Sequence, residues 1–78
     1  MRNRKPTLFF SFASTAAALE AESRCQAEGV PGRLVPVPGQ ITAGCGLAWM
    51  TRPEDGDAVR AFFEQIGLDC QGCHLIDF

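Results

Sequence analysis

Four cysteines and one histidine are the residues of this chain that are best suited to carry chemistry. Cys45 stands between Gly44 and Gly46 in the run Thr-Ala-Gly-Cys-Gly-Leu-Ala. The two glycines remove Cβ atoms that would crowd the sulfur, and they allow a positive φ. Successive backbone N–H groups in such a segment can form a small concavity that binds an anion, and the thiolate is the reactive form of cysteine. The run therefore predicts either a reactive thiol at Cys45 or a small buried cysteine that opens a strand.

A second candidate is the run Cys-Gln-Gly-Cys-His at 70–74. It matches the pattern for attachment of a c-type haem, which we exclude because neither export nor a helical scaffold around a haem is indicated. Cys70 and Cys73 are candidates for resolving or redox thiols. With His74 and Cys45 they also form a candidate zinc set, since zinc takes four such ligands. The structural alternative is that both cysteines are small apolar fillers beside a helix, with His74 on the exposed face of its strand.

Length, composition and charge limit the class of protein. The 78 residues, 46% hydrophobic and 21% charged, fit one globular domain near the lower size limit for a hydrophobic core. The net charge of −2 and the absence of a basic stripe with interleaved aromatics exclude nucleic acid as a partner. No apolar run approaches the roughly 20 residues of a membrane span, so we expect no membrane partner.

The N-terminal residues superficially resemble a signal peptide, because a basic start is followed by apolar and alanine-rich segments. Ser11, Ser14 and Thr15 interrupt the apolar region, and cleavage would remove a strand and a helix from a small domain. We therefore expect a cytoplasmic protein whose cysteines stay reduced, which favours catalytic, metal-binding or core roles over disulfides. Residues 1–6 are expected to form a disordered basic tail, and residues 7–78 a single domain.

Apolar periodicity and turn residues predict four strands and two helices. The strands are expected at 7–12, 32–37, 45–50 and 71–78. The first helix is expected to run from Ser14 or Thr15 to about Glu28, before Gly29, and the second to begin at Pro53 and end at Gly67. The inward faces are expected to comprise Ala18, Ala21 and Cys25 with Ala17 and Leu19 in the first helix, and Ala58, Val59, Phe62, Phe63 and Ile66 in the second.

This order of elements favours an α+β fold, the ferredoxin-like βαββαβ plait, in which two helices cover one face of a four-stranded antiparallel sheet. Strands 7–12 and 45–50 would then be central neighbours that run in opposite directions. Cys45 is therefore expected near Ser14, at the start of the first helix, where N–H groups and the helix dipole favour an anion. Cys70 is expected at the same end of the sheet. The topology thus favours the reactive interpretation of Cys45, with Gly44, Gly46 and Ser14 as the environment of its thiolate.

The runs Ala-Leu-Glu-Ala-Glu at 18–22, Gly-Val-Pro-Gly-Arg-Leu-Val-Pro-Val-Pro at 29–38 and Gly-Cys-Gly-Leu-Ala at 44–48 resemble the putative Se/S carrier protein-like family. The resemblance implies a small carrier that accepts sulfane sulfur or selenium as a persulfide-type adduct on Cys45. It implies a cysteine desulfurase-like donor and sulfur or selenium acceptor proteins as partners, and at most a sulfurtransferase-like activity. No cofactor is expected. Cys70 and Cys73 stand where the family tends to have aliphatic residues.

Two other classes of function stay open at the level of the sequence. Ferredoxin-like plaits often pair or bind small effectors, and a fold alone does not decide a function. The chain could therefore be a non-catalytic regulatory or protein-interaction module, including one that forms a homodimer. A third reading is a small metal-binding domain that uses Cys70, Cys73 and His74. Unreactive thiols would favour the interaction module over the carrier.

Overall fold

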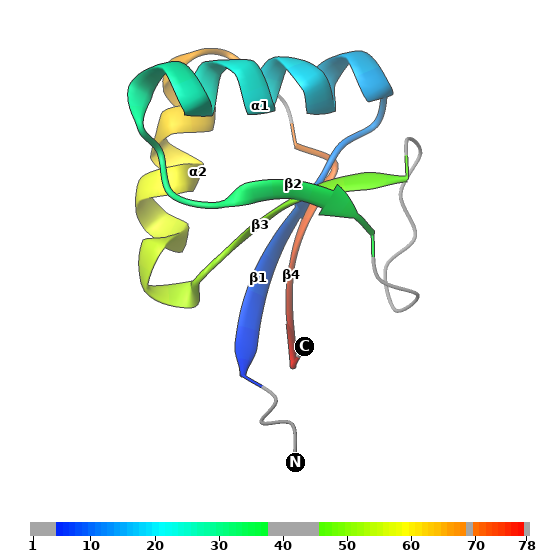
Figure 1. Cartoon of the computed structure of the whole chain (residues 1–78), viewed down its shortest axis with the longest axis vertical. Coiled ribbons are helices and arrows are strands. Elements are labelled where there is room, and N and C mark those ends of the chain that lie inside the picture. Colours follow the sequence, from blue (N-terminus) through cyan, green and yellow to red (C-terminus); the bar gives the residue numbers. More distant parts are fainter. Residues whose placement is uncertain (1–4, 38–45, 69, 78) are drawn as a thin grey trace.

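A computed structural model describes residues 5–37, 46–68 and 70–77. Its strands form one antiparallel sheet in the order β2-β3-β1-β4, which is the arrangement of a ferredoxin-like plait. Figure 1 shows both helices packed on the same side of this sheet. The predicted α+β fold is confirmed. The elements are β1 (Pro6–Ser11), α1 (Thr15–Glu28), β2 (Arg33–Pro36), β3 (Leu47–Thr51), the 3₁₀ turn η1 (Pro53–Asp55), α2 (Gly56–Gln65) and β4 (Gly72–Asp77).

Several predicted boundaries move by one to three residues. The sequence predicts a strand from Cys45, but β3 begins at Leu47, because Gly46 takes a φ of +76° that no strand accommodates. The sequence also predicts Pro53 as the first residue of the second helix. Pro53 instead opens the 3₁₀ turn η1, and the α-helix begins at Gly56. Gly56 is buried, and a Cβ at this position would collide with the side chain of Leu8.

The main core lies between the helices and one face of the sheet. Phe63 of α2 is its centre: its ring meets those of Phe10 and Phe12 edge-on, with centroids 5.5 and 5.9 Å apart. This geometry is favourable for aromatic pairs and adds to the burial of apolar area. The buried members of this core are Phe10, Phe12, Ala18, Ala21, Cys25, Trp49, Val59 and Phe63.

Two residues of the predicted inward faces lie outside this core. Leu19 is 51% exposed, and Ala58 is also exposed. In α1 the buried stripe is confined to small side chains at Ala18, Ala21 and Cys25. These small residues let the helix approach the sheet closely, so the contact is narrow and Leu19, one position round the helix, falls outside it.

The face of the sheet away from the helices carries a smaller apolar cluster. Phe9 and Ala48 are fully buried there, and Val35, Val37, Met50 and Ile76 pack against them. His74 pairs with Phe9 and lies on this same face, half-buried. The sequence predicts His74 on the exposed face of its strand, but the exposed positions of β4 are Cys73, Leu75 and Asp77, and His74 is half-buried on the other face, beside the Phe9 cluster.

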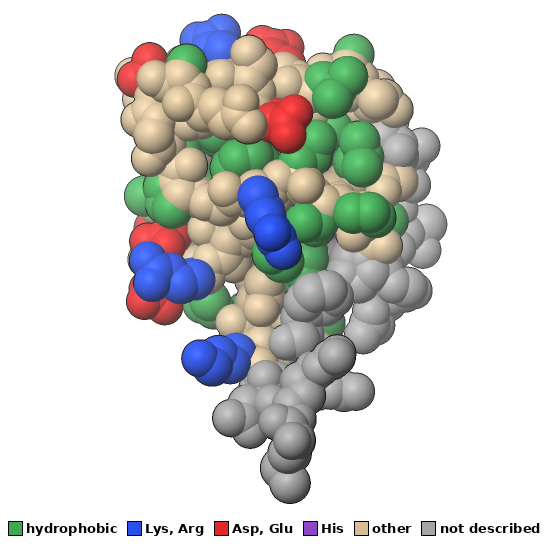
Figure 2. All heavy atoms as spheres, viewed as in Figure 1, with side chains coloured by type: hydrophobic (Ala, Val, Ile, Leu, Met, Phe, Trp, Pro, Cys, Tyr) green, Lys and Arg blue, Asp and Glu red, His purple; other side chains and the backbone are tan. Residues whose placement is uncertain are grey.

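The surface combines charged and hydrophobic side chains. Figure 2 shows hydrophobic side chains gathered over β2 and between β2 and α1. Among the described residues, the large hydrophobic side chains that are exposed are Leu19 and Leu75. No helix in the described part of the chain is long and apolar enough to cross a membrane.

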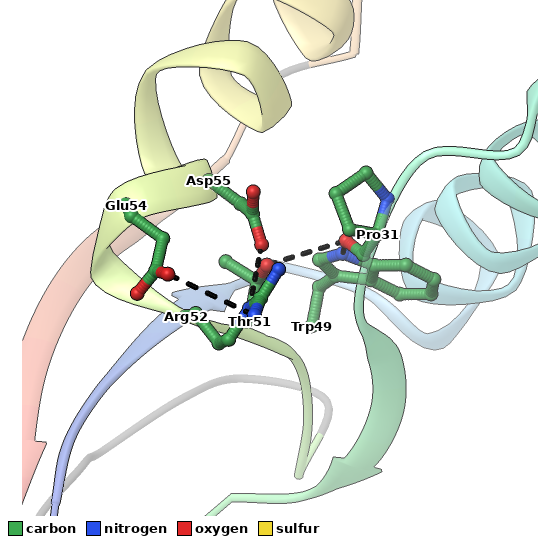
Figure 3. A network of polar contacts seen from close by, with 6 residues as sticks. All are labelled: Pro31, Trp49, Thr51, Arg52, Glu54 and Asp55. Carbon is green, nitrogen blue, oxygen red and sulfur yellow. Dashed lines mark hydrogen bonds and ion pairs between the residues drawn. The ribbon is translucent and has the colours of Figure 1, made fainter.

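A polar network fixes the end of the sheet where β2 begins and β3 ends. The indole Nε1 of Trp49 and the hydroxyl of Thr51 both donate to the carbonyl oxygen of Pro31, at 3.1 and 3.3 Å (Figure 3). Arg52 donates from Nε to the Asp55 carboxylate at 3.0 Å. These contacts border a cavity of about 490 Å³ lined by Thr7, Pro31, Gly32, Arg33, Met50, Thr51, Arg52 and Asp55.

Candidate functional site

Four segments meet at the opposite end of the sheet: the end of β1 and the starts of α1, β3 and β4 (Figure 1). Ser11 at the end of β1 pairs with Ala48 of β3, and its carbonyl accepts a hydrogen bond from the Gln71 N–H at 2.7 Å. Ser14, which begins α1, lies three residues further along the chain. The register therefore brings Gly46, Ser14 and the segment before β4 to one end, as the topology predicts.

Cys45 and Gly44 lie outside the described residues, and Gly46 is the described neighbour of this pair. Gly46 is exposed, has a φ of +76°, and an added Cβ there would meet nothing within 4 Å. The left-handed backbone, and not crowding, is therefore what favours glycine. Its carbonyl accepts a hydrogen bond from the Val37 N–H at 3.0 Å, which ties the start of β3 to the end of β2. The sequence indicated that glycine would allow a positive φ here, and Gly46 has one.

Ser14 is the N-cap of α1. Its hydroxyl oxygen accepts a hydrogen bond from the Ala17 N–H at 3.1 Å, and its backbone is extended. The first turn of α1 carries no acidic side chain, so the positive end of the helix dipole is not neutralised there. The cap uses the Ser14 oxygen as an acceptor and fixes where the helix begins, while the O–H remains a donor that a nearby thiolate could accept from.

Cys70 and Cys73 line a pocket between α2 and β4 with a volume of about 310 Å³. Cys73 is exposed, and its Sγ accepts a hydrogen bond from the Arg60 guanidinium Nη2 at 3.4 Å. Cys70 is half-buried and packs against the main core. The pocket is lined by Phe10, Arg60, Phe63, Glu64, Leu68, Cys70, Gly72 and Cys73.

Arg60 is a candidate site residue that the sequence does not reveal. It is an exposed position of α2 beside the buried Val59, and it looks like an ordinary solvated charge. Its contact with Cys73 spans 13 positions of the chain and arises only when α2 packs beside β4. The available signal was weak: Arg60 stands three residues before Phe63, so it lies near the core-facing stripe of an amphipathic helix.

The two faces of β4 separate the residues of the alternative metal set. Cys73 pairs with Phe10 and faces the helices, whereas His74 pairs with Phe9 on the other face. The His74 Nε2 lies 3.4 Å from the Ser11 hydroxyl oxygen. Within residues 5–37, 46–68 and 70–77, no three histidine, cysteine or acidic side chains gather as metal ligands would. Cys70, Cys73 and His74 therefore do not form a metal site by themselves.

Cys25 is fully buried on the core side of α1, as predicted for a structural cysteine. Burial, and secondly the charge of Cys70, raise the pKa of Cys25 from its ordinary 9.0 to about 11. The folded state therefore keeps a proton on Cys25 at pH values where the unfolded chain has lost it. Burial and the raised pKa together keep Cys25 as an inert, protonated thiol at neutral pH.

We expect the raised pKa of Cys25 to make folding stability depend on pH. Its contribution is fully present below about pH 9 and is lost as the pH rises towards 11, by about 2–3 kcal/mol in total. Urea unfolding of the unmodified chain and of Cys25→Ala at pH 8 and pH 11 measures this. The difference in stability between the two should shrink as the pH rises. A difference that stays constant would contradict the assignment.

A family model described as "Putative Se/S carrier protein-like" matches residues 7–75. Curated proteins and solved structures give no match. The matched range runs from β1 into β4, so it covers every helix of the plait and contains Cys45, Cys70 and Cys73. The chain therefore belongs to the putative Se/S carrier protein-like family.

Proposed function

We propose that this protein carries sulfur or selenium as a persulfide-type adduct on Cys45 and passes it to an acceptor protein. The observation that carries the proposal is the family match over residues 7–75. The exposed, left-handed Gly46 beside Cys45 in the chain supports it, because a reactive thiol needs an uncrowded approach. The start of α1 at the same end of the sheet also supports it, since a helix N-terminus stabilises an anion.

The proposed transfer is an exchange between thiolates. The Cys45 thiolate attacks the outer sulfur of a persulfide on the donor, so that a new S–S bond forms and the S–S bond of the donor breaks. The donor leaves as a thiolate with the electron pair, and no net oxidation occurs. In the delivery step a thiolate of the acceptor attacks the outer sulfur of the Cys45 persulfide, and Cys45 leaves as a thiolate. A cysteine desulfurase-like enzyme is the donor class that supplies such a persulfide, and a reducing, cytoplasmic setting keeps the thiols available.

The test is incubation of the protein with a cysteine desulfurase and cysteine, followed by mass spectrometry of each cysteine peptide. We expect a gain of one sulfur atom, about 32 Da, on the peptide that contains Cys45. Cys45→Ser should lose this gain, and Cys25→Ala is the matched control that should keep it. A selenium donor should give the corresponding selenium adduct.

The alternative function makes the opposite prediction in the same experiment. A non-catalytic regulatory or protein-interaction module would gain no sulfur on Cys45 at any donor concentration. That outcome would overturn the carrier proposal. So would a gain of sulfur by the Cys45→Ser protein, on the peptide that contains residue 45, equal to that of the unmodified protein.

A further inference from the structure

A second thiol of this protein has a cationic partner of its own. Cys73 lies on the helix-facing side of β4, and the Arg60 guanidinium donates to its Sγ at 3.4 Å. The pKa of Arg60 is raised, first by this hydrogen bond and then by the charge of Cys73. Arginine beside a cysteine is one of the arrangements that make a thiol nucleophilic.

The pocket beside Cys73 gives this thiol room for a small partner. Its volume of about 310 Å³ is at the lower end of the range for small-molecule sites. Phe10, Phe63 and Leu68 supply an apolar wall, while Arg60 and Glu64 supply its charged side chains. Sulfur chains are soft and weakly hydrated, so an apolar wall beside a guanidinium suits them. Cys70 lines the same pocket, so two thiols of the chain open onto one cavity.

We propose that Cys73 is a second sulfur-accepting thiol, that Arg60 positions it, and that its donor is a small anionic persulfide and not a protein. The nature of the cargo rests on the proposed function, but the site itself uses no part of the segment around Cys45. Cys73 is reached from the side of α2 and β4, and its pocket is lined by residues of β1, α2, β4 and the segment between α2 and β4.

The proposed step conserves atoms and electrons. The Cys73 thiolate attacks the outer sulfur of a small persulfide R–S–SH, and a bond forms between Sγ and that sulfur. The S–S bond of the donor breaks, and R–S⁻ leaves with the electron pair. The hydrogen stays on the transferred sulfur, so the first product is the neutral Cys73 persulfide, which then releases this proton to water; no oxidant or reductant is needed. Arg60 holds the anionic Sγ before the attack and the charged persulfide after it.

The experiment uses the full chain with Cys45→Ser and glutathione persulfide as the probe. Fragmentation mass spectrometry then separates Cys73 from Cys70, which lie on one tryptic peptide. We expect a gain of about 32 Da on Cys73. Arg60→Gln should lower the rate at which Cys73 gains sulfur by about three- to tenfold. Arg60→Lys should keep most of that rate because it keeps the charge. Arg24→Gln, which removes an exposed cation from α1, is the matched control and should leave the rate unchanged.

A charge-sensitive readout separates positioning from a general structural effect. Arg60→Gln should lower the rate of Cys73 alkylation by the anion iodoacetate more than by the neutral iodoacetamide, whereas a loosened fold would alter both rates alike. No sulfur on Cys73, or equal rates for Arg60→Gln and Arg24→Gln, would overturn the inference.

The proposed function is tested separately from this inference, in a Cys73→Ser chain. Sulfur on Cys73 of the Cys45→Ser chain, but none on Cys45 of the Cys73→Ser chain, would leave this inference standing and remove the carrier function of Cys45. Sulfur on Cys45 but none on Cys73 would do the reverse.

Discussion

Gly32→Ala will lower the free energy of unfolding by about 3 kcal/mol or more, the largest effect we expect from so small a change. Gly32 has a φ of +124°, which side chains rarely adopt. An added Cβ would collide with the indole Nε1 of Trp49 and would lie 2.6 Å from the carbonyl oxygen of Met50. The backbone oxygen is part of β3, so the clash cannot be relieved by the movement of one flexible side chain.

The indole of Trp49 also has little freedom to move away. It is 2% exposed, and its Nε1 donates to the Pro31 carbonyl at 3.1 Å, which Thr51 shares (Figure 3). Displacing the ring would therefore break a buried hydrogen bond and disturb the core together.

Urea unfolding of Gly32→Ala and Gly29→Ala measures the effect of the clash. Gly29 ends α1 with a φ of +70°, but an added Cβ there would meet nothing within 4 Å. This control therefore includes the cost of a left-handed residue, about 1 kcal/mol, without a collision. If both variants lose the same stability, the predicted collision between a Cβ at position 32 and Trp49 is contradicted.

Phe63→Ala will cost about 3–5 kcal/mol of folding stability. Phe63 is 1% exposed, and its ring contacts Phe10 on β1 and Phe12 directly after β1. Alanine would lose the transfer free energy of the ring and leave a cavity between α2 and the sheet. Phe10 lies on a strand that is held by neighbours on both sides, so its ring cannot collapse into that space.

Phe62→Ala is the matched control for Phe63→Ala, because it deletes the same side chain one position along α2. Phe62 is half-buried and packs at the edge of the main core, so its loss should cost clearly less. Chemical denaturation of both variants gives the comparison. A cost for Phe62→Ala equal to or above that for Phe63→Ala would place the centre of the core elsewhere.

The fold could be predicted because local signals and global packing agree. Ser14 and Gly29 bound α1 as predicted, the first through its side-chain cap and the second through a φ of +70°. The order of strands followed from the order of elements, since few topologies bury one face of a four-stranded sheet. Leu19 shows the limit: periodicity predicts which side of a helix faces inward, but the width of the buried stripe depends on how closely the helix approaches.

The candidate site could be predicted only in part. The sequence showed that Gly46 could take a positive φ, but it predicted a strand from Cys45 and so placed Gly46 inside the strand and not before it. The role of Cys45 stays a prediction, since residue 45 lies outside the described residues. The Arg60–Cys73 contact could not be predicted, because it depends on the angle at which α2 crosses β4 and on the rotamer of a long, exposed side chain.

The pairing of Pro6 with Asp77 gives this protein a particular response to mechanical force. Tension applied through the two described ends of the chain acts across the β1–β4 ladder at its outer pair, perpendicular to the strands and along the hydrogen bonds. The bonds between these strands would be loaded one after another and not all at once. β4 should therefore peel away from the sheet at low force, beginning at Asp77 and ending at Gly72, while α1 still covers β3.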